Sequence, residues 1–343
     1  MFKASKLLKL FIRIAISAFL VWLLVSNTDV SEIWEALVKT NHIILVLCVA
    51  VYLLGQVISS FKWKLICETV GFRNKPKDYI KYYFMGMFFS LFLPTTVGGD
   101  FIKALYLARG DSAKRKAPSI YTVLMDRYSG VIVIVAMATV GMFLPIAEKV
   151  PVAFKILTFS LMGLICLITP TFPTLMMKLF KNKKWARTML KDIRVYWQNP
   201  DMFAKTLLWS LLFNFTVILI HVAIADAMSI HIPLLYYLVL YPITAISGFV
   251  PFSFNGLGPR EATYIILLSV VGVKQPQAIV FSLLWFSIVL ISGCFGIIPY
   301  IKTKLNKLSA DIEIEEEDFD LIKESEMADE NENTELENAS TTA

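Results

Sequence analysis

An arginine and a glutamate interrupt a long apolar stretch in the last third of the chain. Arg260 and Glu261 lie between the apolar runs 233–250 and 262–273. A guanidinium stays charged in a partly dry site and can give two parallel hydrogen bonds to a phosphate group. Glycines let the backbone approach a ligand closely, and a helix that starts here has N–H groups that favour anions. The residues that supply this break in the backbone are Asn255, Gly256 and Gly258.

Two interpretations of this charged pair are open. In the first, Arg260 binds an anionic ligand, and Glu261 orients Arg260 or carries a coupling proton or ion. In the second, the two side chains form an internal ion pair that closes the break. Ionisable residues at membrane depth are costly and mark functional sites by default, so the sequence favours the first interpretation.

A second break, from Pro94 to Asp100, carries similar residue types. Asp100 and Lys103 are three residues apart, which places them on one face of a helix. Asp100 either contributes to a ligand site or stabilises the first turn of that helix, and the sequence favours neither. Lys103 either joins the site or extends to the membrane interface. The break itself contains Gly98 and Gly99.

A third charged pair, Asp126 and Arg127, lies within an otherwise apolar run. Adjacent residues on a helix point to different faces, so each side chain needs a partner on another segment. Arg127 could pair with Asp100 or with Glu261, and the sequence leaves this open. Together with the two breaks, this pair completes the set of residues expected to bind substrate.

Other polar residues in or beside the apolar runs have a plainer explanation. Gln56 and Asn214 could donate to a lipid headgroup, but the sequence favours interhelical hydrogen bonds for both. His221 is expected to lie at the outer membrane interface, and Lys62 to begin a basic cytoplasmic loop. The three histidines and four cysteines lack the spacing of a metal site, and no nucleophile–base arrangement or nucleotide-binding loop is visible. The sequence therefore predicts no metal, no cofactor, no nucleic-acid partner and no enzymatic activity.

These residues lie in a chain with the composition of a membrane protein. Its 343 residues are 57% hydrophobic and only 17% charged, with a mean hydropathy of +0.64, whereas soluble domains carry about 25% charged residues. We therefore expect an all-α polytopic membrane protein with about six full transmembrane helices. The runs long enough to cross a bilayer are 7–25, 43–61, 118–144, 152–170, 203–225 and 277–299.

Two further segments, 79–108 and 233–273, are apolar but contain the breaks described above. The first arm of 79–108 would extend about 22 Å as a helix, which is less than the hydrocarbon core of about 30 Å. Basic residues flank both ends of 79–108, so both ends are expected in the cytoplasm, and both ends of 233–273 are expected outside. Each segment is predicted to be a re-entrant helical hairpin, and the two enter from opposite faces. The same rule places the N- and C-termini in the cytoplasm.

The two hairpins belong to units of opposite orientation. Residues 43–144 and 203–299 are each predicted to form a helix, a hairpin and a helix, which is an inverted-topology repeat. In transporters with such repeats the substrate site lies near the middle of the bilayer, between interrupted segments. The transmembrane domain is expected to extend over 1–308. The remainder, 309–343, is acidic and poor in aromatic residues, and is expected to be a disordered cytoplasmic tail.

With these motifs the chain resembles the membrane domain of the lysylphosphatidylglycerol synthase family, whose members are also described as flippase-like membrane proteins. The likeness covers residues 5–305 and rests on Leu93 to Lys103, on Asp126-Arg127, and on Pro251 to Glu261. The resemblance implies a domain that moves a lipid between leaflets. Full-length members add a soluble aminoacyl-transferase domain, which this sequence lacks, so lysyl transfer is not expected.

The leading hypothesis is a lipid translocator in the cytoplasmic membrane of a bacterium or an archaeon. Its substrate would carry an anionic headgroup, as a phospholipid or a polyprenyl phosphate does, and the basic cytoplasmic loops would concentrate such lipids. Two alternatives stay open: a coupled secondary transporter of a small anionic solute, and a non-catalytic membrane partner of a lipid-modifying enzyme. The sequence does not indicate an oligomeric state.

Overall fold

The computed structural model describes most of the region that the sequence assigns to the membrane. The described residues are 26, 29–92, 98–110, 116–180, 196–197, 199–249 and 256–304, with the side chains of 116–117 and 172–180 left aside. All regular secondary structure in these ranges is helical, which confirms the predicted all-α class. The predicted span 7–25, the tips of both hairpins and the acidic tail lie outside the described residues.

Five helices in the described ranges are long and apolar enough to cross a membrane, with mean hydropathies between 1.7 and 2.4. They correspond to five of the six predicted spans. Polar caps fix two of their starts: the side chain of Asn41 accepts a hydrogen bond from Ile43 N at 3.0 Å, and that of Asn199 accepts one from Met202 N at 3.1 Å. The helices are α3 (His42–Thr69), α6 (Lys116–Met142), α7 (Val152–Phe180), α9 (Pro200–Ala227) and α12 (Gln275–Cys294).

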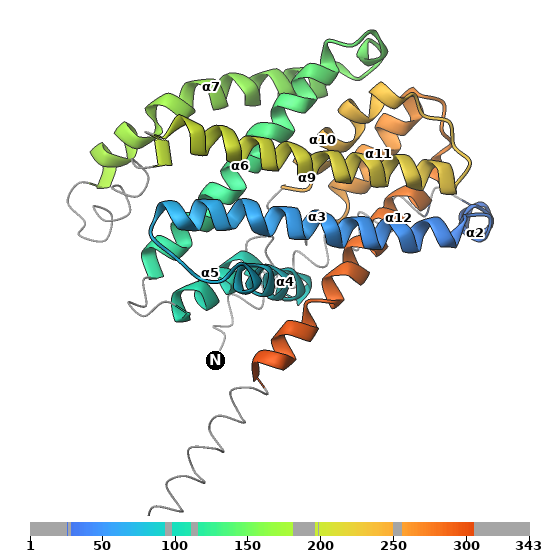
Figure 1. Ribbon diagram of the computed structural model, residues 1–343. Helices are drawn as coiled ribbons and strands as arrows, with labels where there is room; N and C mark the ends of the chain where they lie inside the picture. The colour runs from blue at the N-terminus through green and yellow to red at the C-terminus, as the bar shows by residue number, and fades with distance from the viewer. Residues whose placement is uncertain are drawn as a thin grey trace, which may run out of the picture. The chain divides into compact units, whose positions relative to one another are not determined.

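Four short helices occupy the two interrupted segments. α4 (Pro76–Phe92) packs against α5 (Gly98–Arg109), and α10 (Tyr237–Ser247) packs against α11 (Pro259–Val270) (Figure 1). The longest of the four, α4, has 17 residues and extends about 26 Å, so each is shorter than the hydrocarbon core. Two helix pairs thus stand where hairpins were predicted. Their entry from opposite faces, and the inverted repeat, stay predictions.

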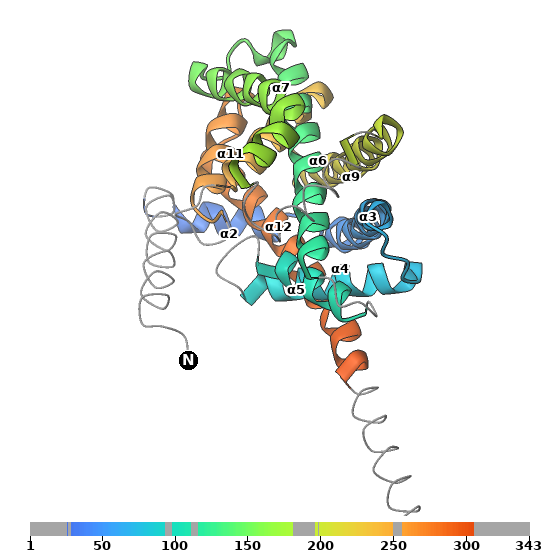
Figure 2. The same cartoon turned by 90° about the vertical axis from the view of Figure 1, so that its left-hand side faces the viewer.

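Close approach between helices depends on small residues. α3 and α9 run side by side in Figure 1, and in Figure 2 they are seen nearly end-on with α6 beside them. A Cβ atom on Gly55 of α3 would lie 2.7 Å from Thr216 Oγ1 of α9. In the first hairpin, a Cβ on Gly99 would overlap the carbonyl oxygen of Gly86 and the hydroxyl of Ser90. These contacts are typical of helices that pack in membranes.

The remaining elements are short. The helix α2 (Val30–Val38) starts at Asp29, whose carboxylate accepts a hydrogen bond from Ser31 N at 2.8 Å, and it packs against α12. Two single 3-10 turns, η1 (Pro145–Ala147) and η2 (Leu234–Tyr236), precede α7 and α10. The described residues up to 296 belong to one compact unit. Of the second unit, the structure describes 297–304, which are helical.

Candidate functional site

The first hairpin carries a buried lysine between two carboxylates. Lys103 of α5 is only 2% exposed, and its Nζ lies 2.6 Å from Asp126 Oδ2 of α6 and 3.2 Å from Asp100 Oδ1. The same ammonium lies over the ring of Tyr83, 4.2 Å from its centroid. Asp100 and Lys103 therefore share a helix face, as predicted. The alternative in which Lys103 extends to the membrane interface is wrong, because its charge is neutralised inside the protein.

Asp126 has a second lysine partner that the sequence places elsewhere. Lys62 of α3 is 5% exposed, and its Nζ lies 2.9 Å from Asp126 Oδ1 and donates to the Asp126 backbone oxygen at 2.9 Å. The expectation of Lys62 in a cytoplasmic loop is wrong, since α3 continues to Thr69. The sequence contains a signal for this longer helix, because apolar residues continue at helical spacing beyond Lys62. The buried ones are Trp63, Ile66 and Cys67.

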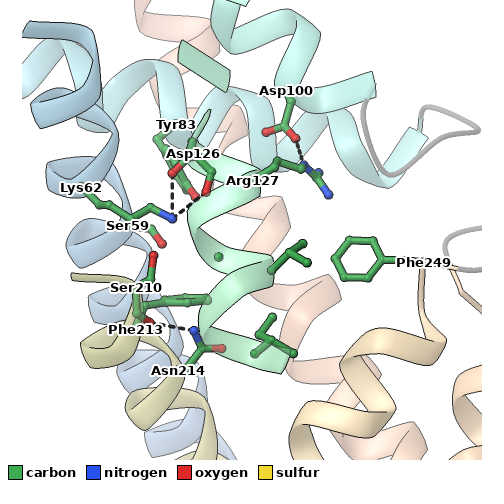
Figure 3. Close-up of a pocket in the computed structure, with 13 residues that line it drawn as sticks. Ser59, Lys62, Tyr83, Asp100, Asp126, Arg127, Ser210, Phe213, Asn214 and Phe249 are labelled. Carbon is green, nitrogen blue, oxygen red and sulfur yellow. Dashed lines mark hydrogen bonds and ion pairs between the residues drawn. The ribbon is translucent and has the colours of Figure 1, made fainter. Parts of the chain in front are cut away.

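Arg127 forms an ion pair with Asp100, the first of the two partners considered for it. As expected for adjacent residues on a helix, Asp126 and Arg127 point to different partners. Figure 3 shows Lys62 and Arg127 reaching the two carboxylates from different helices. Among the described residues, the cluster contains three cations and two carboxylates, which is one positive charge in excess.

The second hairpin holds its arginine at the start of α11. Arg260 is bonded to its neighbour through Nη2 at 2.8 Å and Nε at 3.2 Å, both to Glu261 Oε1. The other carboxylate oxygen, Oε2, accepts a hydrogen bond from Gly258 N at 2.6 Å. Gly258 and Gly256 have φ angles of +98° and +79°, which glycine adopts without strain. The internal Arg–Glu pair of the second interpretation is therefore present. Asn255 lies outside the described residues.

Three adjoining cavities are lined by residues of the two hairpins and of the long helices. The serine cavity, about 160 Å³, is lined by Ser59, Lys62, Tyr83, Asp100, Asp126, Arg127, Gly130, Val131, Ile134, Ser210, Phe213, Asn214 and Phe249 (Figure 3). The lysine cavity, about 280 Å³, is lined by Tyr52, Gln56, Tyr83, Gly86, Met87, Ser90, Leu91, Asp100, Lys103, Arg127 and Val289. The arginine cavity, about 250 Å³, is lined by Tyr52, Phe213, Val217, Tyr241, Thr244, Ala245, Gly248, Phe249, Arg260, Tyr264 and Trp285.

The three cavities share lining residues and therefore adjoin one another. Asp100 and Arg127 line both the serine and the lysine cavity. Phe249 lines both the serine and the arginine cavity, and Tyr52 both the lysine and the arginine cavity. Charged residues of both hairpins therefore line adjoining cavities. Five other predicted site residues line none of the three cavities: Gly98, Gly99, Gly256, Gly258 and Glu261.

Two further polar residues of α9, Asn214 and His221, are buried and hydrogen-bonded. Asn214 donates to Ser210 O at 2.7 Å and accepts from Tyr241 OH at 2.5 Å, which is the expected interhelical hydrogen bond between α9 and α10. The expectation for His221 is wrong: it is fully buried, with Nδ1 donating to a backbone oxygen and Nε2 2.6 Å from Tyr264 OH. Two hydrogen-bond partners compensate for its burial, so it needs no interface.

Comparison with known proteins supports this assignment of the chain to the membrane. Among curated proteins, no match was found. The family model described as the lysylphosphatidylglycerol synthase TM region matches residues 10–296, which include both helix hairpins and all three cavities. The protein is thus an integral membrane protein, and it belongs to the lysylphosphatidylglycerol synthase transmembrane family.

Proposed function

We propose that this protein moves a lipid with an anionic headgroup between the two leaflets of the cytoplasmic membrane. One observation carries the proposal: adjoining cavities, lined by residues of both short-helix hairpins, contain more cations than carboxylates. Among the described residues, the four cations exceed the three carboxylates by one charge: Lys62, Lys103, Arg127 and Arg260 against Asp100, Asp126 and Glu261. Buried charge is costly unless it is compensated, and a phosphate group supplies that compensation.

Arg260 is the residue to which we assign the phosphate. A guanidinium has five N–H donors, and its bonds to Glu261 use Nε and Nη2. The side chain is 12% exposed and lines the arginine cavity, so the pair with Glu261 fixes the guanidinium at the cavity wall. The remaining N–H groups then serve the ligand, and a positioned donor loses less entropy on binding than a mobile one.

Access from both leaflets follows from the predicted opposite orientation of the hairpins. The headgroup would enter the polar cavities from one face and leave toward the other, while its hydrocarbon tails stay in the bilayer. Movement of a lipid in this way requires no bond to form or break. We therefore propose a transporter and not an enzyme, with the termini in the cytoplasm and the basic loops attracting anionic lipid on that side.

Reconstitution tests the proposal. Purified protein is placed in liposomes with fluorescent phosphatidylglycerol or a labelled polyprenyl phosphate in the inner leaflet, and arrival in the outer leaflet is followed by chemical quenching. We expect Arg260→Ala to slow movement about 10- to 100-fold, since a hydrogen bond to a charged group contributes about 1.5–3 kcal/mol. Arg73→Ala is the matched control, because Arg73 is exposed and lines none of the three cavities.

Two outcomes contradict the proposal. One is movement no faster than in protein-free liposomes, and the other is equal movement by wild type and the Arg260→Ala variant. Uptake of a small soluble anion without any change in lipid distribution would instead identify a solute carrier, which needs the same cationic site.

A further inference from the structure

The short helix α2 has two apolar sides, and only one of them faces the protein. The first side is half-buried and packs against the hydrophobic core through Ile33, Ala36 and Leu37. The second side is exposed, and its residues recur every four positions, so they form one stripe along the helix. This apolar stripe consists of Val30, Trp34 and Val38, with exposed fractions of 65%, 66% and 58%.

The third side of α2 is polar. It follows the apolar stripe around the helix and consists of the exposed residues Ser31, Glu32, Glu35 and the C-cap Lys39. Glu35 and Lys39 form an ion pair that is more than 60% exposed on both sides, which suits contact with water. The apolar stripe does not suit water, because a tryptophan and two valines would be hydrated there at a cost in free energy. The stripe therefore needs an apolar partner.

The direction of α2 indicates which partner this is. In Figure 1, α3 runs across the picture and α2 is seen end-on at the right-hand end of α3, whereas in Figure 2 α3 is seen nearly end-on and α2 runs across the picture. The link between them is short, and within it Asn41 N donates to the oxygen of Ala227, the last residue of α9, at 2.9 Å. Since α3 and α9 are long and apolar enough to cross a membrane, a helix that lies across their ends runs along the membrane surface.

We propose that α2 is an interfacial helix that lies in the plane of the membrane and inserts its apolar stripe at the boundary between lipid headgroups and acyl chains. The partner of the stripe is thus the lipid surface at the face where α3 begins, which is the outer face in the predicted topology. Protein, lipid and water follow one another around the helix, as the three sides require. Trp34 has the residue type that is enriched at this boundary, since its ring is apolar and its N–H is polar.

In this position α2 connects the membrane surface to the arginine cavity. It packs against α12 and is followed directly by α3. These two helices meet at Trp285 and Tyr52, whose rings contact edge to face with centroids 5.7 Å apart, and both residues line the arginine cavity. The interfacial helix therefore sets the depth in the bilayer at which the ends of α3 and α12 are held.

Spin labels on single cysteines test the proposal in the full chain. The four native cysteines are replaced, and Val30→Cys, Trp34→Cys, Val38→Cys and Glu35→Cys proteins are labelled with a nitroxide and placed in liposomes of phosphatidylglycerol and phosphatidylethanolamine. Molecular oxygen concentrates in lipid and a soluble nickel chelate in water, so paramagnetic relaxation by each reports the surroundings of the label. We expect the three stripe positions to be more accessible to oxygen, and Glu35→Cys, the matched control on the polar side, to be more accessible to nickel.

Depth provides the second readout. The ratio of the two accessibilities should give nearly equal depths for positions 30 and 38, because α2 lies in the plane. A helix that stood along the membrane normal would separate these positions by about 12 Å.

Three results would overturn the proposal. Nickel accessibility at the stripe equal to that of Glu35→Cys would place the stripe in water. Low accessibility to both reagents would show that protein covers it, either another segment of this chain or a second copy. A large difference in depth between positions 30 and 38 would show that α2 crosses the boundary and does not lie in it. None of these readouts depends on lipid movement, so they are independent of the proposed function.

Discussion

Asp126 is the residue on which the first charge cluster depends. It accepts from Lys62 and from Lys103, at 2.9 and 2.6 Å, and all three side chains are at most 6% exposed. Each lysine comes from a different helix, so one carboxylate compensates charges that α3 and α5 bring to α6. Neither pair could be predicted, because Lys62 and Asp126 are 64 positions apart in the sequence and nothing in the local pattern joins them.

Removing this carboxylate should destabilise the protein strongly. Asp126→Asn leaves two buried ammonium groups with reduced compensation, and breaking a buried ion pair costs about 3–5 kcal/mol. The free energy of unfolding can be followed by circular dichroism as SDS replaces a mild detergent. Glu35→Gln is the control, since the Glu35–Lys39 pair is more than 60% exposed on both sides and its loss should leave the transition where it is. An unchanged transition for Asp126→Asn would refute the compensating role.

At the scale of helices, the membrane-spanning segments are predictable, because the length and hydropathy of a helix determine whether it can cross a bilayer. The predicted span 43–61 corresponds to α3, which extends further because Lys62 is paired with Asp126 inside the protein and does not mark the membrane edge. The first arm of 79–108 is recognisable because it is too short to cross, whereas 233–273 is predicted as a hairpin from the expected location of its two ends. The serine cavity could not be predicted, because Ser59 and Ser210 look like ordinary helical serines in the sequence. They line a common cavity only when three helices pack together.

The crossing of α4 and α5 leads to a prediction about one glycine. A Cβ atom on Gly99 would overlap Gly86 O and the Ser90 hydroxyl, so Gly99→Ala must push α5 away from α4 and carry Asp100 and Lys103 with it. Overpacking of this kind costs about 1–3 kcal/mol. We expect a lower SDS unfolding transition together with slower lipid movement.

Gly163→Ala provides the comparison for this variant. A Cβ atom on Gly163, which lies within α7, would meet open space, with no neighbouring atom within 4 Å. Alanine favours a helix over glycine by about 0.5–1 kcal/mol, so the unfolding transition of this variant should stay or rise. Gly99→Ala protein that unfolds and transports like wild type would contradict the tight crossing.

At the scale of the whole molecule, the predicted topology can be mapped with single cysteines in a background without native cysteines. Ser229→Cys and Lys274→Cys should react from outside the cell with a membrane-impermeant maleimide, whereas Lys75→Cys and Arg109→Cys should react only after permeabilisation. All four positions are exposed in the structure. Labelling of positions 229 and 274 from opposite sides would mean that the segment between them spans the membrane, and the re-entrant prediction would be wrong.

The two hairpins differ in how their charges are anchored, and this gives them different mechanical freedom. Arg260 and Glu261 are neighbours on one helix, so α11 can shift or rotate as a rigid body while its ion pair stays closed. Asp100 and Lys103 of α5 are tied to Arg127 and Asp126 of α6, so any sliding of α5 along α6 must pull opposite charges apart. The first hairpin is therefore held to α6 by ion pairs, whereas within the described residues α11 is held to its neighbours by hydrogen bonds, such as that between Tyr264 and His221, and by no ion pair.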